Sequence, residues 1–275
     1  MKIGIGIDTG GTYTDVVAYD FENRRILSCA KSLTTKEDLS LGILGALDQL
    51  PRELVQQAQL ISLSSTLATN ACVEDKGGSA KLIFFGGDKR IIDDLGGAYG
   101  LPPSKDMHIQ ESFTDFSGGA EREPDWEYFC ISLNDGYRFL DGVGIVEMNA
   151  MRNGAVVEKK AKELFLQKYN IPVVCGHELF SELNSLQRAS STLLNAQLFP
   201  IIKEFLTAIK AAMEKRGIHA GLVIVRSDGS LMSEAFASTS PVETILCGPA
   251  ASVIGGRHLS GNANSIIVDM GGTTT

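Results

Sequence analysis

Short apolar runs alternate with polar residues over the first 32 positions and predict three strands. The runs are 2–8, 14–20 and 24–32, and the polar segment 20–25 can turn the chain between the last two. Because such short connections join neighbouring strands, we expect the three strands to pair antiparallel as a β-meander.

The spacing of apolar residues becomes helical beyond residue 36. Five apolar residues at this spacing precede Pro51, which ends the first helix: Leu39, Ile43, Leu44, Leu47 and Leu50. The strongest helical pattern covers 185–216 and is followed by Gly217, a residue type that commonly ends helices. Pro200 interrupts this pattern, so we expect a kink there or two helices that abut.

Strands and helices alternate along the rest of the chain. Further strands are predicted at 59–65, 80–87, 171–176, 221–233 and 264–272. Further helices are predicted at 66–77, 154–170 and 241–256, the last with two glycine breaks. A meander followed by interleaved strands and helices predicts an α/β fold with a mixed sheet flanked by helices. Residues 88–154 carry turn signals and weak strand patterns, and we interpret them as an insertion or subdomain.

Composition narrows the class of protein. The 275 residues are 44% hydrophobic and 21% charged, as is usual for a globular protein. The net charge of −8 argues against a nucleic-acid surface, which needs clustered Lys and Arg. No apolar run is long enough to span a membrane. The five cysteines are scattered and form no Cys-x-x-Cys pair, which favours reduced thiols in a cytoplasmic protein.

One pattern occurs twice, near the two ends of the chain. Residues 8–15 read DTGGTYTD, and residues 269–275 read DMGGTTT. Both copies follow a short apolar run. Five positions agree between the copies: Asp8, Gly10, Gly11, Thr12 and Thr14 with Asp269, Gly271, Gly272, Thr273 and Thr275. Chance explains five matching polar or glycine positions poorly, which favours a shared chemical role.

This pattern suits a turn that binds phosphate. Glycines permit a tight hairpin and leave backbone N–H groups accessible to phosphate oxygens. The threonine hydroxyls add donors, and an aspartate at the end of a strand can bind Mg²⁺ through water. A single copy could equally be an ordinary glycine hairpin. Two copies facing across a cleft would grip a polyphosphate from both sides, with Asp8 and Asp269 sharing one metal ion.

The phosphate motifs resemble those of the actin, Hsp70 and sugar-kinase superfamily. More narrowly, the sequence resembles the hydantoinase A / 5-oxoprolinase / acetone carboxylase β family. The matching segments appear in that family's order: 6–17 (GIDTGGTYTDVV), 65–78 (STLATNACVEDKGG), 176–200, 226–233 (RSDGSLMS), 240–256 (SPVETILCGPAASVIGG) and 266–275 (IIVDMGGTTT). The ATNA segment and the combination of GPAA with DMGGTTT are specific to the family, whereas the phosphate motif alone is not.

The resemblance implies an actin-like ATPase fold of the ribonuclease H-like type, with ATP and Mg²⁺ as cofactors. Two phosphate loops would contact the nucleotide: Thr9, Gly10, Gly11, Thr12 and Thr14, and Gly271, Gly272, Thr273 and Thr274. Asp8 and Asp269 would hold the metal and act in catalysis, and Asp269 would also orient the nucleophile. Residues 1–178 would form the family's N-terminal domain, with an insertion at about 88–154. Residues 179–275 would begin a second domain that is truncated at the second phosphate loop.

The activity implied by the resemblance is ATP-dependent hydrolysis of a cyclic amide of the hydantoin or 5-oxoproline type. The ring amide would be activated by phosphoryl transfer, and a hydantoinase B-type subunit is an expected partner. With most of one lobe absent, the chain alone is expected to be inactive. Alternatives on the same fold are an ATP-driven switch or activase and an acetone carboxylase-type subunit. A small-molecule kinase is disfavoured, because sugar kinases are not expected to carry the ATNA segment.

Five further positions keep two interpretations each. Thr66 and Asn70 stand where a helix follows a strand, so they can bind an anion or a substrate, or simply cap the helix. His177, in a segment that matches the family, has either a substrate-side role or a hydrogen-bonded structural one. Cys247 is either a small residue in close packing or a reactive thiol. Asp15 either joins the metal and water network or caps its own turn.

Overall fold

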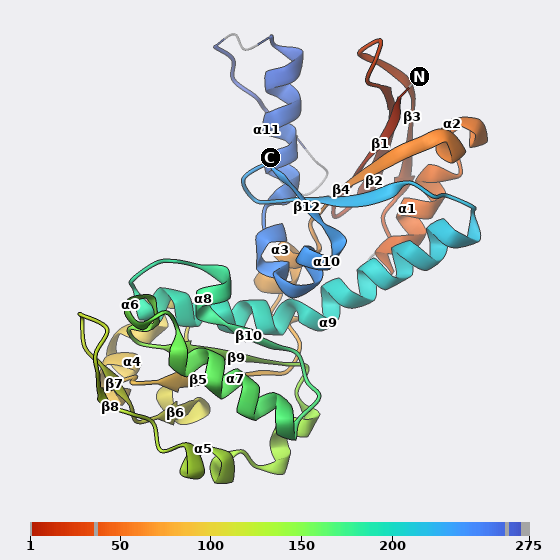
Figure 1. Cartoon of the computed structure of the whole chain (residues 1–275). Helices are drawn as coiled ribbons and strands as arrows, with labels where there is room; N and C mark the ends of the chain where they lie inside the picture. Colours follow the sequence, from red (N-terminus) through yellow and green to blue (C-terminus); the bar gives the residue numbers. More distant parts are fainter. Residues whose placement is uncertain (1, 36–37, 262–263, 271–275) are drawn as a thin grey trace. The chain divides into compact units, whose positions relative to one another are not determined.

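Two compact units make up the chain. The computed structural model describes residues 2–35, 38–261 and 264–270 (Figure 1). Unit 1 comprises Met1–Lys76 and Ile201–Thr275, and unit 2 comprises Gly77–Pro200. The boundaries of the two compact units therefore differ from the expected division at 178/179. That division concerns the family's domains, and it stays a prediction.

Unit 1 is built on a six-stranded mixed sheet with the order β12-β11-β4-β1-β2-β3. Its strands are β1 (Ile3–Thr9), β2 (Tyr13–Asp20), β3 (Arg25–Leu33), β4 (Ala58–Ser65), β11 (Gly221–Val225) and β12 (Leu231–Ser233). Strands β1 to β3 pair antiparallel, β4 runs parallel to β1 and β11 parallel to β4, and β12 returns antiparallel. The predicted meander and mixed sheet are confirmed, and the order is that of a ribonuclease H-like sheet.

Helices cover opposite faces of this sheet. The helical elements of unit 1 are α1 (Leu39–Leu47), α2 (Arg52–Gln57), α3 (Leu67–Val73), α10 (Glu234–Thr239), η4 (Pro241–Thr244) and α11 (Cys247–Leu259), together with the second part of α9 (Ser185–Lys215), which begins in unit 2. A Cβ added to Gly42 of α1 would lie 3.1 Å from Thr14 Oγ1, whereas one added to Gly248 of α11 would lie 3.6 Å from Asp8 Oδ1. Side chains alternate along the paired strands, so α1 and α11 lie on different sides.

Unit 2 contains a four-stranded sheet in which every strand is parallel to its neighbours. The order is β10 (Val173–Cys175), β9 (Gly142–Glu147), β5 (Ala80–Phe85) and β6 (His108–Gln110), and β7 (Phe113–Thr114) pairs with β8 (Ala120–Arg122) in a separate ribbon. Strand β9 is buried along its whole length. It lies within 88–154, where the sequence predicted no strand, because such a run carries no alternation to reveal it.

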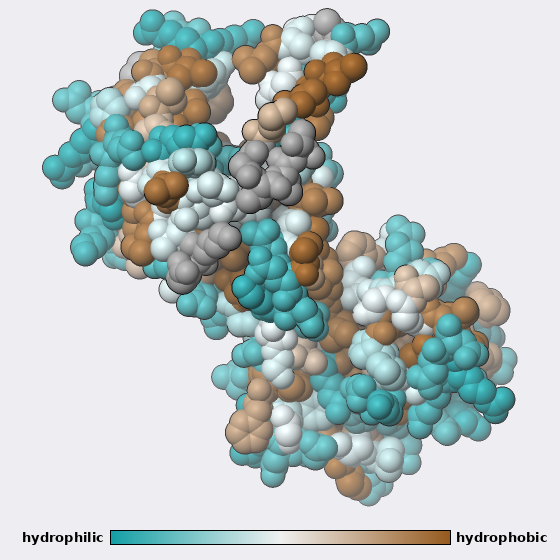
Figure 2. Space-filling view, turned by 180° about the vertical axis from the view of Figure 1, so that it is seen from behind, coloured by the Kyte–Doolittle hydropathy of each residue, from teal (hydrophilic) through white to brown (hydrophobic). Residues whose placement is uncertain are grey.

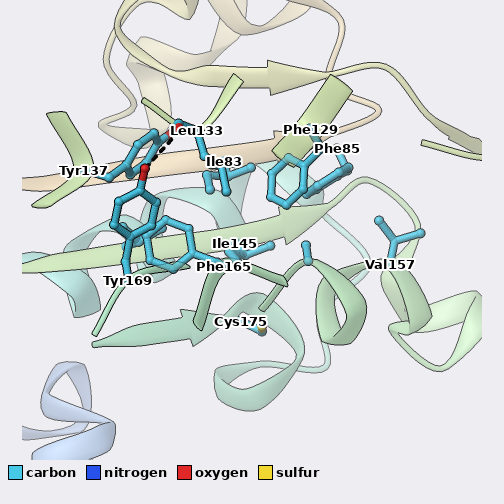
Figure 3. Packing of buried hydrophobic residues seen from close by; sticks show 12 residues of the cluster. Ile83, Phe85, Phe129, Leu133, Tyr137, Ile145, Val157, Phe165, Tyr169 and Cys175 are labelled. Carbon is cyan, nitrogen blue, oxygen red and sulfur yellow. Dashed lines mark hydrogen bonds between the residues drawn. The ribbon is translucent and has the colours of Figure 1, made fainter. Parts of the chain in front are cut away.

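Helices enclose the parallel sheet on both faces (Figure 1). They are α4 (Lys89–Leu95), η1 (Gly96–Tyr99), η2 (Ser104–Asp106), α5 (Trp126–Ser132), η3 (Asp135–Phe139), α6 (Ala150–Asn153), α7 (Val156–Lys168) and α8 (Gly176–Leu179), together with the first part of α9 (Ser185–Lys215). One core packs α5 and α7 on β5 and β9, and a second core packs α4 and α9 on the other face. In the first core the rings of Tyr137, Phe165 and Tyr169 gather at one end (Figure 3).

Three details of the predicted elements are wrong. Helix α9 is a single helix through Pro200, so the alternative of two abutting helices is wrong, whereas the alternative of a kink stays a prediction. Helix α11 continues through both glycines that were expected to break it, because glycine weakens a helix without preventing it. The segment 264–270 is not a strand, since no neighbouring strand pairs with it among the described residues.

The described residues include no helix that is both long and apolar enough to cross a membrane. On the face seen in Figure 2, hydrophilic and hydrophobic residues are interspersed.

The aromatic end of the unit 2 core predicts a sharp contrast between two phenylalanines. Phe165 is fully buried, and Phe139 is 82% exposed. Phe165→Ala should lower the free energy of unfolding of unit 2 by about 3–5 kcal/mol, because it leaves a cavity among aromatic rings. Phe139→Ala should change it by less than about 0.5 kcal/mol.

The single tryptophan, Trp126, reports on this unit, because its ring centroid lies 5.9 Å from that of Phe85. Urea unfolding followed by its fluorescence measures both variants. Equal midpoints for the two would contradict this description of the core.

Candidate functional site

The turn between β1 and β2 presents backbone donors. The Gly10 amide donates to the Tyr13 carbonyl at 3.0 Å and closes the turn, leaving Gly11 and Thr12 at its tip. Within the described residues, neither of these two amides has a hydrogen-bond partner. Neither glycine has a positive φ, so the expected need for unusual backbone angles is not the reason for them. A Cβ on Gly10 would lie 3.2 Å from the Tyr13 oxygen, so close approach favours glycine at position 10.

The threonines of this turn divide into two kinds. Thr9 and Thr14 are fully buried, and the Thr14 hydroxyl hydrogen-bonds the Thr34 hydroxyl at 3.1 Å. The Thr9 hydroxyl is buried without a partner among the described residues. Both side chains lie on the α1 side of the sheet, away from Asp8. These two residues can therefore offer a ligand only their backbone, whereas Thr12 is partly exposed at the tip.

Asp8 is the second-to-last residue of β1. Its side chain lies on the face of the sheet that α11 covers. Its Oδ1 accepts a hydrogen bond from the Ser64 hydroxyl at 2.6 Å. Although the residue is exposed, partial desolvation of its carboxylate raises its pKa, the Ser64 hydrogen bond opposes this, and the negative charges of Asp269 and Asp15 raise it further. A carboxylate with acidic neighbours suits a divalent cation, and oxygen ligands are those that Mg²⁺ prefers. This donor set therefore fits the expected metal.

One face of α11 brings both predicted carboxylates together. Gly248 lies against Asp8, and the Ser252 hydroxyl donates to Asp269 Oδ2 at 2.6 Å. Gly256 follows at the same four-residue interval, and a Cβ there would lie 2.6 Å from the Ile267 side chain. Small residues thus let the segment before Asp269 lie along the helix. The predicted loop residues Gly271, Gly272, Thr273 and Thr274 lie outside the described residues.

Cys247 fixes the start of α11 to the end of β4. Its thiol donates to the Ser65 carbonyl at 3.2 Å, and the Ser65 amide approaches the sulfur at 3.3 Å. The residue is 1% exposed, and burial raises the pKa of its thiol. A thiol held protonated and out of solvent is a poor nucleophile, which favours the packing interpretation.

A pocket of about 430 Å³ opens beside the glycine turn within unit 1. Gly10, Gly11, Thr34, Asn70, Glu74 and Lys76 are among its lining residues. The Thr66 side chain makes no capping hydrogen bond to α3; instead it accepts from Asn70 Nδ2 at 3.2 Å. The ATNA segment is therefore next to the first glycine loop, and Asn70 is the polar residue of that segment that lines the pocket.

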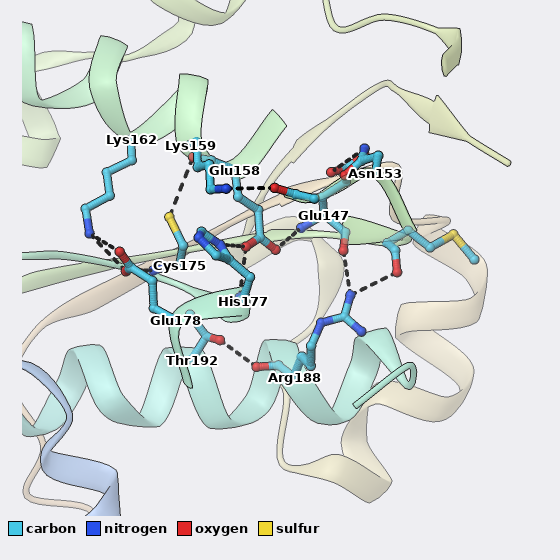
Figure 4. A network of polar contacts seen from close by, with 12 residues as sticks. Glu147, Asn153, Glu158, Lys159, Lys162, Cys175, His177, Glu178, Arg188 and Thr192 are labelled. Carbon is cyan, nitrogen blue, oxygen red and sulfur yellow. Dashed lines mark hydrogen bonds and ion pairs between the residues drawn. The ribbon is translucent and has the colours of Figure 1, made fainter. Parts of the chain in front are cut away.

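His177 lies in unit 2, in a polar network (Figure 4). Its backbone amide donates to Glu158 Oε2 at 2.9 Å, and its Nδ1 lies 2.6 Å from the same oxygen. Glu158 is fully buried, and its Oε1 accepts from the Glu147 amide at 2.8 Å. The Glu158 carboxylate thus fixes the orientation of the imidazole ring. The hydrogen-bonded structural interpretation is thus found, and the substrate-side role stays a prediction.

Three potential metal ligands meet beside this histidine. The ligand atoms of Glu158, Cys175 and His177 all lie within 4.8 Å of one another. However, the Glu158 oxygens already accept hydrogen bonds from two amides and the imidazole. Burial strongly raises the pKa of the Cys175 thiol, so the thiolate that a metal would bind is disfavoured. The arrangement is complete as a hydrogen-bonded network.

Sequence reasoning missed a buried polar network around Glu147 and Arg188 in unit 2. Glu147 and Arg188 are each 1% exposed, and Arg188 Nη2 donates to the Glu147 carbonyl at 2.7 Å. Thr114 and Asn153 donate to the Glu147 carboxylate at 2.6 and 2.9 Å. The available signal was an arginine on a helix face that also carries the buried residues Thr192 and Asn195.

Two family models match the sequence. The hydantoinase/oxoprolinase model matches residues 188–275, and the model of the hydantoinase/oxoprolinase N-terminal region matches residues 4–101. The chain belongs to the hydantoinase/oxoprolinase family. The glycine turn, the ATNA segment and α11 all fall within the matched ranges.

Relatives in this family include three kinds of enzyme. Caprolactamase subunit alpha of Pseudomonas jessenii is 26% identical over 295 residues, which cover 98% of this chain and 42% of that protein. The acetone carboxylase beta subunit of Xanthobacter autotrophicus is 24% identical over 98% of the chain and 42% of its own length. 5-Oxoprolinase of Saccharomyces cerevisiae is 25% identical over 100% of this chain and 25% of its own length. The chain thus spans less than half the length of these relatives.

Solved structures show the same fold. The crystal structure of ATP-dependent caprolactamase from Pseudomonas jessenii matches with a TM-score of 0.80 at 24% identity, over 98% of this chain and 42% of that one. A nucleotide-free structure of acetone carboxylase matches with a TM-score of 0.79 at 20% identity, over 94% and 41%. The predicted fold of this family member is confirmed.

Glu147 predicts a pH dependence of stability. Burial is the main cause that raises its pKa above the ordinary 4.5, so the folded unit favours the protonated form. Stability is then full below 4.5 and is lost as the pH rises through the folded pKa. Glu147→Gln has no proton to lose at this position. Above the folded pKa, its free energy of unfolding should therefore rise relative to that of the wild type by about 1.4 kcal/mol for each unit by which the pKa is raised.

Urea midpoints of the two proteins, measured by Trp126 fluorescence across this pH range, give the comparison. Other titrating groups are common to both proteins and cancel in the difference. Parallel profiles would show that Glu147 is not held protonated by the fold.

Proposed function

We propose that the protein uses ATP and Mg²⁺ to activate a cyclic amide for hydrolysis, as a subunit of a larger enzyme. The observation that carries this proposal is the free pair of amides at Gly11 and Thr12, with Asp8 and Asp269 on one side of the same turn. Support also comes from the relatives, which include an ATP-dependent caprolactamase and 5-oxoprolinase.

The chemistry requires activation because an unstrained amide resists attack by water. Its nitrogen is a poor leaving group, and resonance stabilises its carbonyl. Transfer of the γ-phosphoryl group to the amide oxygen makes the carbonyl carbon a far better electrophile. The protein's part is to position the reactants and neutralise charge.

Each part of the turn has a proposed role. The amides of Gly11 and Thr12 bind phosphate oxygens, together with Gly271, Gly272, Thr273 and Thr274 of the second loop. Asp8 and Asp269 hold Mg²⁺, which when bound supplies positive charge to the phosphates. Asp269 also orients the nucleophile.

Substrate contacts are proposed at two places. Asn70 lines the pocket beside the glycine turn and offers an amide group to a ring. His177 keeps an imidazole nitrogen free while Glu158 orients the ring. Thr66 supports Asn70 through a hydrogen bond.

A carboxylase subunit is the second candidate. Acetone carboxylase and its relatives carry the same motifs, and one of the matching structures is an acetone carboxylase. In that case the phosphorylated group would be a ketone-derived or bicarbonate oxygen rather than an amide oxygen. In either case a partner subunit is proposed, because relatives are named as alpha, beta and gamma subunits.

Asp8→Asn tests the shared ATP chemistry. In the intact protein, isolated with any subunit that accompanies it, this change should lower ATP turnover by about two orders of magnitude or more, since a metal-binding charge is lost. Asp228→Asn is the matched control, because Asp228 lies on an exposed turn of the same unit and its role there is to accept from Ser230. Normal turnover by Asp8→Asn would remove the assignment.

The choice of substrate class rests on which compound stimulates ATP hydrolysis. A lactam, a hydantoin and 5-oxoproline form one arm, and a ketone with bicarbonate forms the other. Stimulation by the cyclic amides alone supports the hydrolase, and stimulation by the ketone with bicarbonate would replace it by the carboxylase.

A further inference from the structure

A second pocket lies wholly in unit 2 and shares no residue with the glycine turn. Its volume is about 410 Å³, within the range of small-molecule sites. Its wall is formed by β6, α5 and the segments around Ser104 and Asn134. Three lysines line it, Lys81, Lys89 and Lys105, and no aspartate or glutamate does. In a chain with a net charge of −8, this concentration of positive charge needs an explanation.

Lys81 is the most informative of these lysines. The residue is half-buried, and its ammonium group lies 5.7 Å from the centroid of the Tyr137 ring. Among the described residues no carboxylate forms an ion pair with it. A cation–π contact compensates only part of the cost of removing an ammonium group from water. An anion in the pocket would supply the missing charge.

The floor of the pocket is a fixed chain of hydrogen bonds. Ser132 Oγ donates to the Phe129 carbonyl at 2.7 Å, so it must accept from His108 Nε2–H at 3.2 Å. His108 Nδ1 is then an acceptor, and the Tyr137 hydroxyl donates to it at 2.7 Å. Burial lowers the pKa of His108, a hydrogen bond with Gln110 opposes this, and the charge of Lys81 acts in the same direction as burial. The polar groups of the floor thus already have hydrogen-bond partners.

At the mouth of the pocket, Asp93 lies close to two of the three lysines. Asp93 accepts hydrogen bonds from the Ser104 amide and hydroxyl at 2.7 and 2.8 Å. Lys105 and Lys89 lie near enough to help lower the pKa of Asp93. Part of their charge is thus balanced at the rim, whereas that of Lys81 is not.

We propose that this pocket binds a small organic anion, a carboxylate or a phosphate ester, with Lys81 as its central contact and Lys105 at its mouth. The ammonium groups supply charge-assisted hydrogen bonds, and the Tyr128 and Tyr137 rings supply flat walls. The pocket is concave and small, which favours a metabolite. The inference is independent of ATP use, because it rests on other residues in another unit.

Calorimetric titration tests the proposal with two probes, inorganic phosphate and glutarate, at constant ionic strength. Lys81→Gln should weaken binding of the preferred probe about tenfold or more, because a charge-assisted hydrogen bond is lost. Lys105→Gln should weaken it less. A preference for phosphate identifies a phosphate ester as the ligand class, and a preference for glutarate identifies a carboxylate.

Lys160→Gln is the matched control, because its ammonium group also lies over an aromatic ring, 4.4 Å from the Trp126 centroid, but outside the pocket. It should leave binding within about twofold of the wild type. Phosphate bound at the glycine turn would persist in Lys81→Gln and so separates the two sites. If Lys81→Gln fails to fold, the exposed Lys105→Gln carries the test. Saturable binding that neither variant weakens, or no saturable binding of either probe, overturns the proposal.

Discussion

The close approach of α11 to the end of β1 is the contact on which the candidate site depends. Gly248 allows the helix to reach the Asp8 carboxylate, and Cys247 fixes the helix start to Ser65 at the end of β4. Ser252, four residues after Gly248, donates a hydrogen bond to Asp269. A helix with larger side chains on this face would separate two acidic residues that are 261 positions apart in the sequence.

This contact has an electrostatic consequence. Partial desolvation of the Asp8 carboxylate and the acidic neighbours Asp269 and Asp15 raise its pKa, although the residue itself is exposed. A protein accepts such a cost where a cation or a positively polarised ligand offsets it. The free amides of Gly11 and Thr12 stand at the adjoining turn, and this arrangement is suited to a metal-bound polyphosphate.

Much of unit 1 could be predicted from local pattern. Alternating residues from Ile3 to Thr9 gave the strand, and the glycine pair gave the turn. The reason assigned to the glycines was incomplete, because Gly10 is needed for close approach rather than for a positive φ. The sequence also could not show that Thr9 and Thr14 face the core, since that depends on which face α1 covers.

Unit 2 was less predictable for a physical reason. Strand β9 is buried on both faces, so its sequence lacks the period of two that marks a half-exposed strand. The buried polar network of Glu147, Glu158 and Arg188 joins residues from separate elements through hydrogen bonds to backbone groups, and these contacts follow only from the fold. The pocket of unit 2 that is lined by lysines could not be predicted either, because Lys81 and Lys105 come together only through the packing of β5 and β6.

The most direct test of the central claim is a crystal structure of the intact protein with a non-hydrolysable ATP analogue and Mg²⁺. The account predicts phosphate oxygens within hydrogen-bonding distance of the Gly11 and Thr12 amides, and one Mg²⁺ bound by Asp8 and Asp269 directly or through water. An analogue bound elsewhere, with these amides and both carboxylates making no contact to it or its metal, would contradict the account.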